Sequence, residues 1–324
     1  MSYTSLMPLI RKTGSTLSAP DFHNIVNVVF HNEEASYYDA LHKGMWDSLQ
    51  EQVNLLAADA MQAVEKSRKL RLLDIGCGTG LSSQMLLESP LGPQIEKVTL
   101  ADTSIKMLQQ AEKKAAEWVA PYEIVNADIS GITGKYDIIL VSSVLHHIPD
   151  LDGFLQHVNR LQNNGGVFIH LQDPNGDYFN DGEYLERVAE YEKTIRTSDN
   201  SGIVKKLRKT VKRFIGRKDY IDRVNDELLR LNAIKKRMSA QEIWSVTDIH
   251  VEDLPFSTGN GISLKFLSKH LIGYKNISRR SYGFFGPLKS ELSAEFQLRE
   301  EQLIRENFLN GRHIAGTWQK STQE

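Results

Sequence analysis

The chain has 324 residues, of which 40% are hydrophobic and 25% are charged, as expected of a globular protein. Its net charge of −2 lacks the basic excess of nucleic-acid-binding proteins, so we expect no DNA partner, and no apolar run reaches the roughly 18 residues of a membrane span. The single cysteine, Cys77, excludes an intramolecular disulfide and metal sites built from cysteine pairs, and the lack of a signal-peptide pattern in Met1–Ile10 favours a cytoplasmic location.

Residues 1–69 are predicted to form an N-terminal helical cap. Asp21 is a candidate N-cap residue for a first helix. A second helix is expected to begin near Glu33 and to run to about Leu49, and a third covers Leu55–Val64. The cap therefore precedes a different kind of pattern, which begins at residue 70.

A glycine loop after the first predicted strand organises the rest of the chain. Leu70–Ile75 is mostly apolar, which predicts a buried central strand, and Gly76, Gly78 and Gly80 then break it before a helical stretch. The loop lacks the lysine of a phosphate-binding loop, and its G-x-G-x-G spacing differs from the G-x-G-x-x-G of dinucleotide enzymes. Asp74 would repel a pyrophosphate, whereas it suits a cationic ligand that carries an amino group.

Strands and helices alternate regularly from residue 70 to residue 177. After the first strand, further strands are predicted over Lys97–Ala101, Tyr122–Val125, Tyr136–Val141 and Val167–Leu171. Helical stretches separate them. This repetition predicts a parallel sheet with right-handed crossovers, in which ligands bind at the carboxyl ends of the strands.

The glycine loop also carries a family resemblance. Its sequence, Asp-Ile-Gly-Cys-Gly-Thr-Gly at residues 74–80, resembles the first motif of class I S-adenosylmethionine-dependent methyltransferases of the small-molecule type. The resemblance implies that the loop holds the methionine part of S-adenosylmethionine. Asn-Ala-Asp-Ile resembles the family motif in which an acid, here Asp128, binds the adenine amino group and the next residue, Ile129, packs on the ring.

Acid placement favours the same cofactor. Asp102 ends the second predicted strand, where a carboxylate can accept two hydrogen bonds from ribose hydroxyls, although NAD enzymes use the same geometry. Three carboxylates suit a cationic sulfonium and would repel a pyrophosphate, while each acid could instead be an ordinary loop or helix-capping residue. The expected cofactor contacts are Asp74, Gly76, Gly78, Gly80, Asp102, Thr103, Asp128, Ile129 and Ser142.

Two adjacent histidines follow the fourth predicted strand. The run from Val141 to Asp150 resembles the family's Leu-His-His segment, which implies that His146 and His147 lie near the methyl acceptor. We favour His147 as the base that takes a proton from an acceptor hydroxyl, because a neutral imidazole titrates near working pH. The histidines could instead only pack, because methyl transfer can need no more than alignment of the reactants in a dry pocket.

Other acceptor contacts are expected from two segments. Ser36-Tyr37-Tyr38-Asp39 resembles the family element that helps to close the site, so Tyr38 is a candidate substrate contact, or else a packing aromatic. Asp173 follows the fifth strand and could line the acceptor pocket. Catechol-type relatives bind a metal here, but Ser142 stands where they have an aspartate, so we expect no metal.

The last 147 residues are predicted to hold an insertion and the end of the sheet. Residues 178–245 read as a helical insertion or lid, whose basic helix Lys205–Lys218 could face a carrier protein, another anionic partner or only solvent. Residues 246–324 return to the core with strands near Ser278–Phe285 and Gly311–Trp318 around a helix in Leu288–Phe308. The predicted fold is α/β, with a Rossmann-like, seven-stranded, mostly parallel sheet and helices on both faces.

These observations predict an S-adenosylmethionine-dependent methyltransferase. Its acceptor is expected to be a small-molecule or lipid-like compound, methylated at oxygen because of the histidines. Three alternatives stay open: methylation of protein or RNA, a non-catalytic S-adenosylmethionine-binding regulatory module, and an NAD-dependent oxidoreductase, which the loop spacing and acid placement disfavour.

Overall fold

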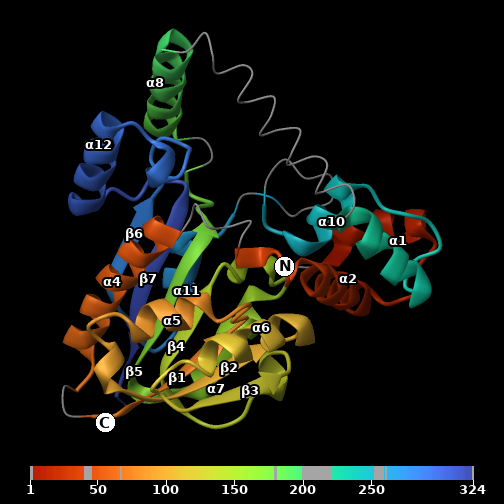
Figure 1. The fold of residues 1–324 in the computed structure, drawn as a ribbon, viewed down its shortest axis with the longest axis horizontal. Coiled ribbons are helices and arrows are strands. Elements are labelled where there is room, and N and C mark those ends of the chain that lie inside the picture. The colour runs from red at the N-terminus through yellow and green to blue at the C-terminus, as the bar shows by residue number, and fades with distance from the viewer. Residues whose placement is uncertain are drawn as a thin grey trace.

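The computed structural model describes residues 3–39, 46–65, 68–178, 181–198, 220–251, 259 and 261–322. Seven strands form one sheet in the order β3-β2-β1-β4-β5-β7-β6 (Figure 1). β7 runs in the opposite direction to the other six strands. The predicted α/β class and the mostly parallel seven-stranded sheet are therefore confirmed. The strands are β1 Leu70–Ile75, β2 Ile95–Asp102, β3 Tyr122–Asn126, β4 Tyr136–Ser142, β5 Gln162–Pro174, β6 Tyr274–Tyr282 and β7 His313–Lys320.

Alternation of side chains along the strands divides the core between the two faces of the sheet. Leu72 and Ile138 face one side, where α4 (Trp46–Ala63), α5 (Leu81–Leu87) and α6 (Ile105–Ala115) pack. Leu73 and Ile139, the next residues along the same strands, face α7 (Leu151–Leu161) and α11 (Leu264–His270) on the other side. Helices on both faces are thus confirmed.

The last two strands end at different residues from those predicted. β6 stops at Tyr282 because Gly283 takes a φ of 78°, so Phe284 and Phe285 are buried beyond the strand rather than within it. The helix before β7 is shorter than predicted: α12 covers Ala294–Arg305, after a 3-10 turn at Lys289–Glu291. Both differences arise at element ends, where tertiary contacts outweigh local pattern.

The N-terminal helices begin and end at other residues than predicted. The N-cap of α2 (Ala19–Glu34) is Ser18, whose side chain accepts a hydrogen bond from the Asp21 backbone N–H, so Asp21 lies inside the helix. Instead of two helices, α4 runs unbroken across the break expected between Leu49 and Leu55. Residues 40–45 lie outside the described residues.

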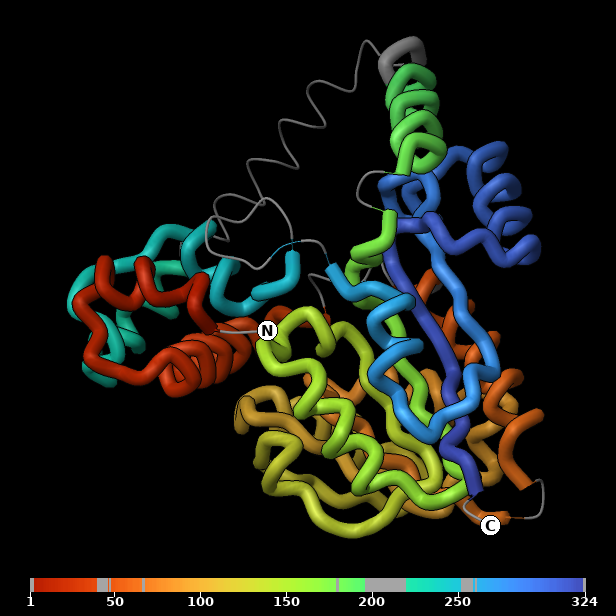
Figure 2. Tube along the Cα trace, turned by 180° about the vertical axis from the view of Figure 1, so that it is seen from behind, coloured from red at the N-terminus to blue at the C-terminus, as the bar shows by residue number. Residues whose placement is uncertain are grey.

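A separate hydrophobic cluster lies beside the carboxyl edge of the sheet. It joins α1 (Met7–Thr13), α2, the helical residues 220–230 and α10 (Ala240–Thr247), with Phe22, Val26, Leu228 and Ile243 fully buried at its centre. We call residues 3–34 and 220–250 the outer helical unit, which Figure 2 shows as red and teal segments lying side by side.

Helices that the sequence placed in one predicted segment pack in different parts of the molecule. α4 belongs to the sheet core, whereas α1 and α2 belong to the outer helical unit. α8 (Gly182–Ser198) packs instead against α12, with the Tyr191 and Phe296 rings 4.9 Å apart. The boundaries at residues 69, 177 and 245 stay predictions. Among the described residues, no helix has the length and apolar character needed to cross a membrane.

Candidate active site

The glycine loop lies between β1 and α5, at the carboxyl end of the sheet. Gly76, Gly78 and Gly80 all have positive φ values, at 66°, 52° and 77°. A Cβ atom on Gly76 would lie 2.5 Å from Val144, so that glycine is needed for packing. A Cβ atom on Gly78 would meet no atom within 4 Å, so the backbone at Gly78 borders open space and can be approached by a ligand.

Asp74 lies beneath this loop, with only 1% of its surface exposed. Its Oδ2 accepts a hydrogen bond of 2.7 Å from the Ser83 hydroxyl, whereas Oδ1 has no partner among the described residues. Burial, opposed by the Ser83 hydrogen bond, raises the pKa of Asp74 to about 7. An unpartnered buried carboxylate oxygen is costly unless a donor reaches it, so the loop fits a ligand that brings a cationic amino group.

Asp102 is fixed at the end of β2. Its Oδ2 accepts a hydrogen bond from the Gly78 N–H at 2.9 Å, and its Oδ1 accepts one from the Ser104 N–H at 2.8 Å. A carboxylate has about four lone-pair directions, so each oxygen can still accept a further bond from a ribose hydroxyl. Thr103 follows directly, and its carbonyl accepts a bond from the Asn126 side chain.

Asp128 caps the short 3-10 turn Ile129–Gly131 after β3. Its Oδ1 accepts bonds from the N–H and the hydroxyl of Ser130 at 2.8 and 2.6 Å and from the Gly131 N–H at 3.2 Å. These bonds, the Ser130 hydroxyl first, hold the pKa of Asp128 below its ordinary value. Ile129 packs against the core next to it. The capping role is thus observed, and the adenine contacts of both residues stay a prediction.

Strained backbone marks the ends of β4 and β5. Ser142 is the last residue of β4, and the next residue, Ser143, has a φ of 57°; Gln172 in β5 has a φ of 67°. The Ser143 hydroxyl donates to the Gln172 carbonyl at 3.2 Å, and the Tyr282 hydroxyl donates to the Gln172 side chain at 2.5 Å. Such conformations are uncommon for residues other than glycine and concentrate at functional sites.

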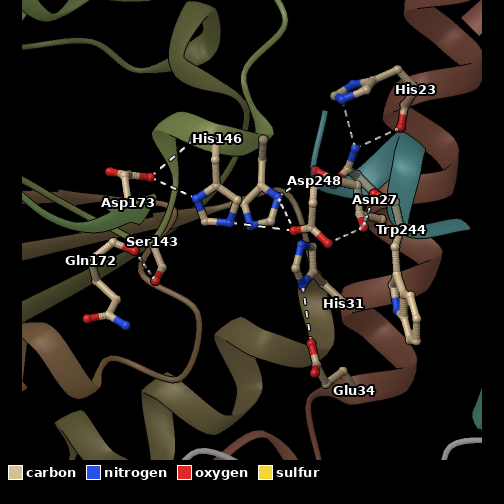
Figure 3. Close-up of polar contacts among 12 residues, drawn as sticks. His23, Asn27, His31, Glu34, Ser143, His146, Gln172, Asp173, Trp244 and Asp248 are labelled. Carbon is tan, nitrogen blue, oxygen red and sulfur yellow. Dashed lines mark hydrogen bonds and ion pairs between the residues drawn. The ribbon is translucent and has the colours of Figure 1, made fainter. Parts of the chain in front are cut away.

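His146 lies between two carboxylates, as Figure 3 shows. Its Nδ1 is 2.8 Å from Asp173 Oδ1, which also accepts the His146 backbone N–H, and its Nε2 is 3.5 Å from Asp248 Oδ1. Burial alone would favour the neutral ring, but the two carboxylates raise the pKa of His146 to about 9. His146 is therefore a buried imidazolium near neutral pH.

His147 has the opposite charge state. Its Nδ1 is 2.5 Å from the Thr247 carbonyl oxygen, which can only accept, so Nδ1 carries the proton and Nε2 carries the lone pair. Burial first, and then the positive charge of His146, hold the pKa of His147 well below its ordinary value, although Asp248 opposes this shift. Of the two histidines, His147 is thus the one that can accept a proton at neutral pH.

The outer helical unit supplies further groups to this site. The His31 ring in α2 lies edge-on to the His147 ring, with centroids 5.3 Å apart, and Asp248 follows α10. The carboxylates of Glu34, Asp102 and Asp248 raise the pKa of His31 despite its burial. Sequence reasoning missed His31, Thr247 and Asp248, because nothing in the local pattern shows that these segments meet His146.

Asp39 contacts the glycine loop. Asp39 accepts a 2.6 Å bond from the Thr79 hydroxyl of the loop and a 3.0 Å bond from Lys114. Burial and the charges of Glu34 and Asp102 raise the pKa of Tyr38. Tyr38 therefore lies within electrostatic reach of the expected ribose acid, and its contact with a substrate stays a prediction.

His146, His147 and Asp248 also form a group whose ligand atoms lie within 4.8 Å of one another, as a metal site would require. A metal needs a lone pair from each histidine. Both nitrogens of His146 face carboxylates and carry protons, and Nδ1 of His147 donates to Thr247. In this arrangement the group holds protons in the place of a cation, and the absence of a bound metal stays a prediction.

The strand order, the bare glycine loop and the acids at three strand ends define a Rossmann-like fold with a candidate cofactor site at the carboxyl edge of its sheet. Residues 73–168 match the family model of the methyltransferase domain. Over these residues the chain is therefore similar to S-adenosylmethionine-dependent methyltransferases, whose cofactor is S-adenosylmethionine.

Curated relatives match in the same region. An ubiquinone biosynthesis O-methyltransferase of Leptothrix cholodnii is 28% identical over 185 residues, which cover 52% of this chain and 77% of that protein. A malonyl-[acyl-carrier protein] O-methyltransferase of Legionella pneumophila is 34% identical over 31% of this chain and 34% of that protein.

Other relatives are much longer than this chain. A hybrid PKS-NRPS synthetase of Macrophomina phaseolina is 32% identical over 35% of this chain, and the match spans only 3% of the synthetase.

Among solved structures, the plantazolicin methyltransferase BpumL in complex with SAH is 13% identical, with a TM-score of 0.45 over 92% of this chain and 96% of that chain. At this TM-score the likeness carries no information about function.

Proposed function

We propose that this chain transfers a methyl group from S-adenosylmethionine to an oxygen atom of a small-molecule or lipid-like acceptor. The observation that carries the proposal is the pairing, at one edge of the sheet, of a glycine loop open to a ligand with a neutral, half-buried histidine whose Nδ1 is already bonded. The glycine loop suits the cofactor, and the histidine suits an acceptor hydroxyl that must lose its proton.

The cofactor half would be held by the residues at the ends of β1, β2, β3 and β4. Asp102 would accept the ribose hydroxyls, Asp128 the adenine amino group and Asp74 the amino group of the methionine part, with Thr103, Ile129 and Ser142 beside them. When bound, S-adenosylmethionine supplies an electrophilic methyl group on a positively charged sulfur, and the bonding electron pair stays on that sulfur as the methyl group leaves.

The histidine half would handle the acceptor. His147 Nε2 takes the acceptor's hydroxyl proton, because its Nδ1–H is held by the Thr247 carbonyl and its lone pair is therefore at Nε2. His146, held by Asp173, is the neighbouring positive charge that keeps His147 neutral before the acceptor binds. Asp173 is fully buried and its Oδ2 has no partner among the described residues, so an acceptor with a second donor group would satisfy it.

The curated relatives support an oxygen acceptor. Two of them are named as O-methyltransferases, one in ubiquinone biosynthesis and one acting on a malonyl group carried by acyl-carrier protein. The acceptor proposed for this chain is accordingly a small compound, either free or attached to a carrier protein. A hydroxyl acceptor would need the His147 base, whereas a carboxyl acceptor is already ionised at neutral pH and would not. The segment Lys205–Lys218, named above as a possible docking helix, lies outside the described residues.

A labelled-methyl screen tests the proposal. The chain is incubated with methyl-labelled S-adenosylmethionine and with cell extract divided into small-molecule, lipid, protein and RNA fractions. We expect label in a small-molecule or lipid product that is stable as an ether or ester. Label confined to protein or RNA would contradict the acceptor class, and no label in any fraction, although S-adenosylhomocysteine binds, would favour a non-catalytic cofactor-binding module.

A further inference from the structure

The short segment that carries the two histidines is held by the outer helical unit at four points. The His250 N–H donates to the His146 carbonyl at 3.2 Å, and the His250 ring donates to the Ile148 carbonyl at 2.8 Å. The His23 ring bonds the backbone of His147, and the Thr247 carbonyl accepts the His147 ring N–H. These contacts join residues that are about 100 or more positions apart in the chain.

Asp248 lies at the centre of these contacts. Its Oδ1 is 3.4 Å from His147 Nδ1 and 3.5 Å from His146 Nε2. It also raises the pKa of His31, whose ring packs on that of His147. One carboxylate from the outer helical unit thus faces both His146 and His147. Figure 3 shows Asp248 beside His146.

We propose that Asp248 is a positioning residue for methyl transfer, which fixes the tautomer of His147 together with Thr247 and balances the positive charge that His147 acquires when it takes the acceptor's proton. This role rests on the proposed function. It makes the outer helical unit part of the active site, because the base is assembled only where residues 247–250 meet the sheet edge.

The electrostatic reason for this role of Asp248 is the positive charge that His146 already carries. His146 carries one charge close to His147, with the two ring centroids 4.0 Å apart, so a second charge on His147 would be repelled unless a carboxylate lies beside both rings. Asp173 contacts only His146 among the two, whereas Asp248 faces both. The titratable groups that face His147 are His23, His31, His146 and Asp248. Glu34, Asp173 and His250 lie one contact further away, on His31, on His146 and on the Ile148 carbonyl.

The variant Asp248→Asn tests the charge with almost no change in shape. We expect the methyl-transfer kcat to fall at least tenfold over pH 6–9, because the protonated form of His147 loses its counter-charge. The affinity for S-adenosylhomocysteine is expected to stay within about threefold of the wild type, since Asp248 lies outside the glycine loop. Asp248→Glu, which keeps the charge, should recover a large part of the rate. Asp226→Asn is the matched control, because Asp226 belongs to the same unit, is exposed and pairs with Arg237.

A second measurement separates positioning from folding and needs no acceptor. In ¹⁵N-histidine NMR of the wild type, His147 should be neutral at pH 7 with its proton on Nδ1, and in Asp248→Asn the titration midpoint of His146 should fall by about one pH unit or more. A wild-type rate in Asp248→Asn, or a rate loss matched by equal losses of cofactor affinity and thermal stability, would overturn the positioning role. A wild type that shows the expected tautomer but methylates nothing would contradict the proposed function and leave the positioning of His147 supported.

Discussion

The two halves of the candidate site are built in different ways. The cofactor half is made from one stretch of chain, and its bonds span short separations, such as 9 residues from Asp74 to Ser83 and 24 from Asp102 to Gly78. The histidine half joins a turn after β4 to the end of β5 and to the outer helical unit, so that the bond from His147 to Thr247 spans 100 residues. Cofactor binding is therefore a local property of the fold, whereas acceptor chemistry depends on how distant segments pack.

This contrast predicts that the two halves can be damaged separately. A change in the histidine half should reduce the rate of methyl transfer and leave cofactor binding intact. A change in the cofactor half should weaken cofactor binding and leave the rate of methyl transfer intact. Variants that fail to separate the two effects would show that the halves form one cooperative unit.

The largest expected effect is on the rate. His147→Ala removes the group that takes the acceptor's proton, so we expect kcat to fall by about 100-fold or more, in the range typical of general-base catalysis. Calorimetry should find an unchanged affinity for S-adenosylhomocysteine. The control is His270→Ala, because His270 lies in α11 and its ring donates a hydrogen bond to the Phe266 carbonyl of the same helix. Full activity of His147→Ala would remove it as the base.

The charge on His146 should appear as a pH dependence of stability. Because the folded pKa of about 9 lies above the ordinary 6.5, the contribution of His146 to the unfolding free energy is fully present below pH 6.5 and is lost as the pH rises to 9. A shift of this size corresponds to about 3 kcal/mol at most. Denaturant unfolding of the wild type and of His146→Gln should therefore give a stability difference that shrinks between pH 6.5 and 9. A difference that is constant over this range would show that His146 is neutral in the folded protein.

A smaller effect is expected in the cofactor half. Asp102→Ala removes the carboxylate that we expect to accept the ribose hydroxyls, so S-adenosylhomocysteine should bind at least about tenfold more weakly, the size of one charge-assisted bond. Asp152→Ala, an exposed acid in the first turn of α7, is the control. Titration calorimetry that gave equal affinities for wild type and Asp102→Ala would count against the ribose contact.

The smallest expected effect is that of metal removal. Since the nitrogens of His146 and His147 that face Asp248 carry protons, extended treatment with a chelator should leave the methyl-transfer rate unchanged. Metal analysis of the protein before and after treatment accompanies the assay. A rate that is lost on chelation and restored by a divalent cation would assign a metal to His146, His147 and Asp248.

Sequence alone predicted the fold well, for a physical reason, and the residues that it named for the cofactor half stay a prediction. The apolar strand, the glycines and the acid at the end of β2 are local signals, and strand–helix alternation admits few topologies. The cap and the insertion were harder, because an amphipathic helix shows that it has an apolar face without showing what covers it. α2 and α10 cover each other's apolar faces, while α4 covers the sheet.

The histidine half was predicted only as three separate residues. His146 and His147 were named from the run after β4, and Asp173 from the end of β5, and the structure brings His146 and Asp173 into contact. What sequence could not indicate was their charge state, because the charge on His146 and the neutral form of His147 follow from Asp248 and Thr247 of the outer helical unit. A single Asp near residue 250 has no signature that marks it as a partner.

A crystal structure of the chain with S-adenosylhomocysteine would test the central claim most directly. We expect the adenosyl ligand in the space bordered by Gly78, with its ribose on Asp102 and its sulfur towards the edge of the sheet where His147 lies. A ligand bound elsewhere on the chain, or a saturated crystal without ligand at the glycine loop, would contradict the proposed cofactor site and the chemistry built on it.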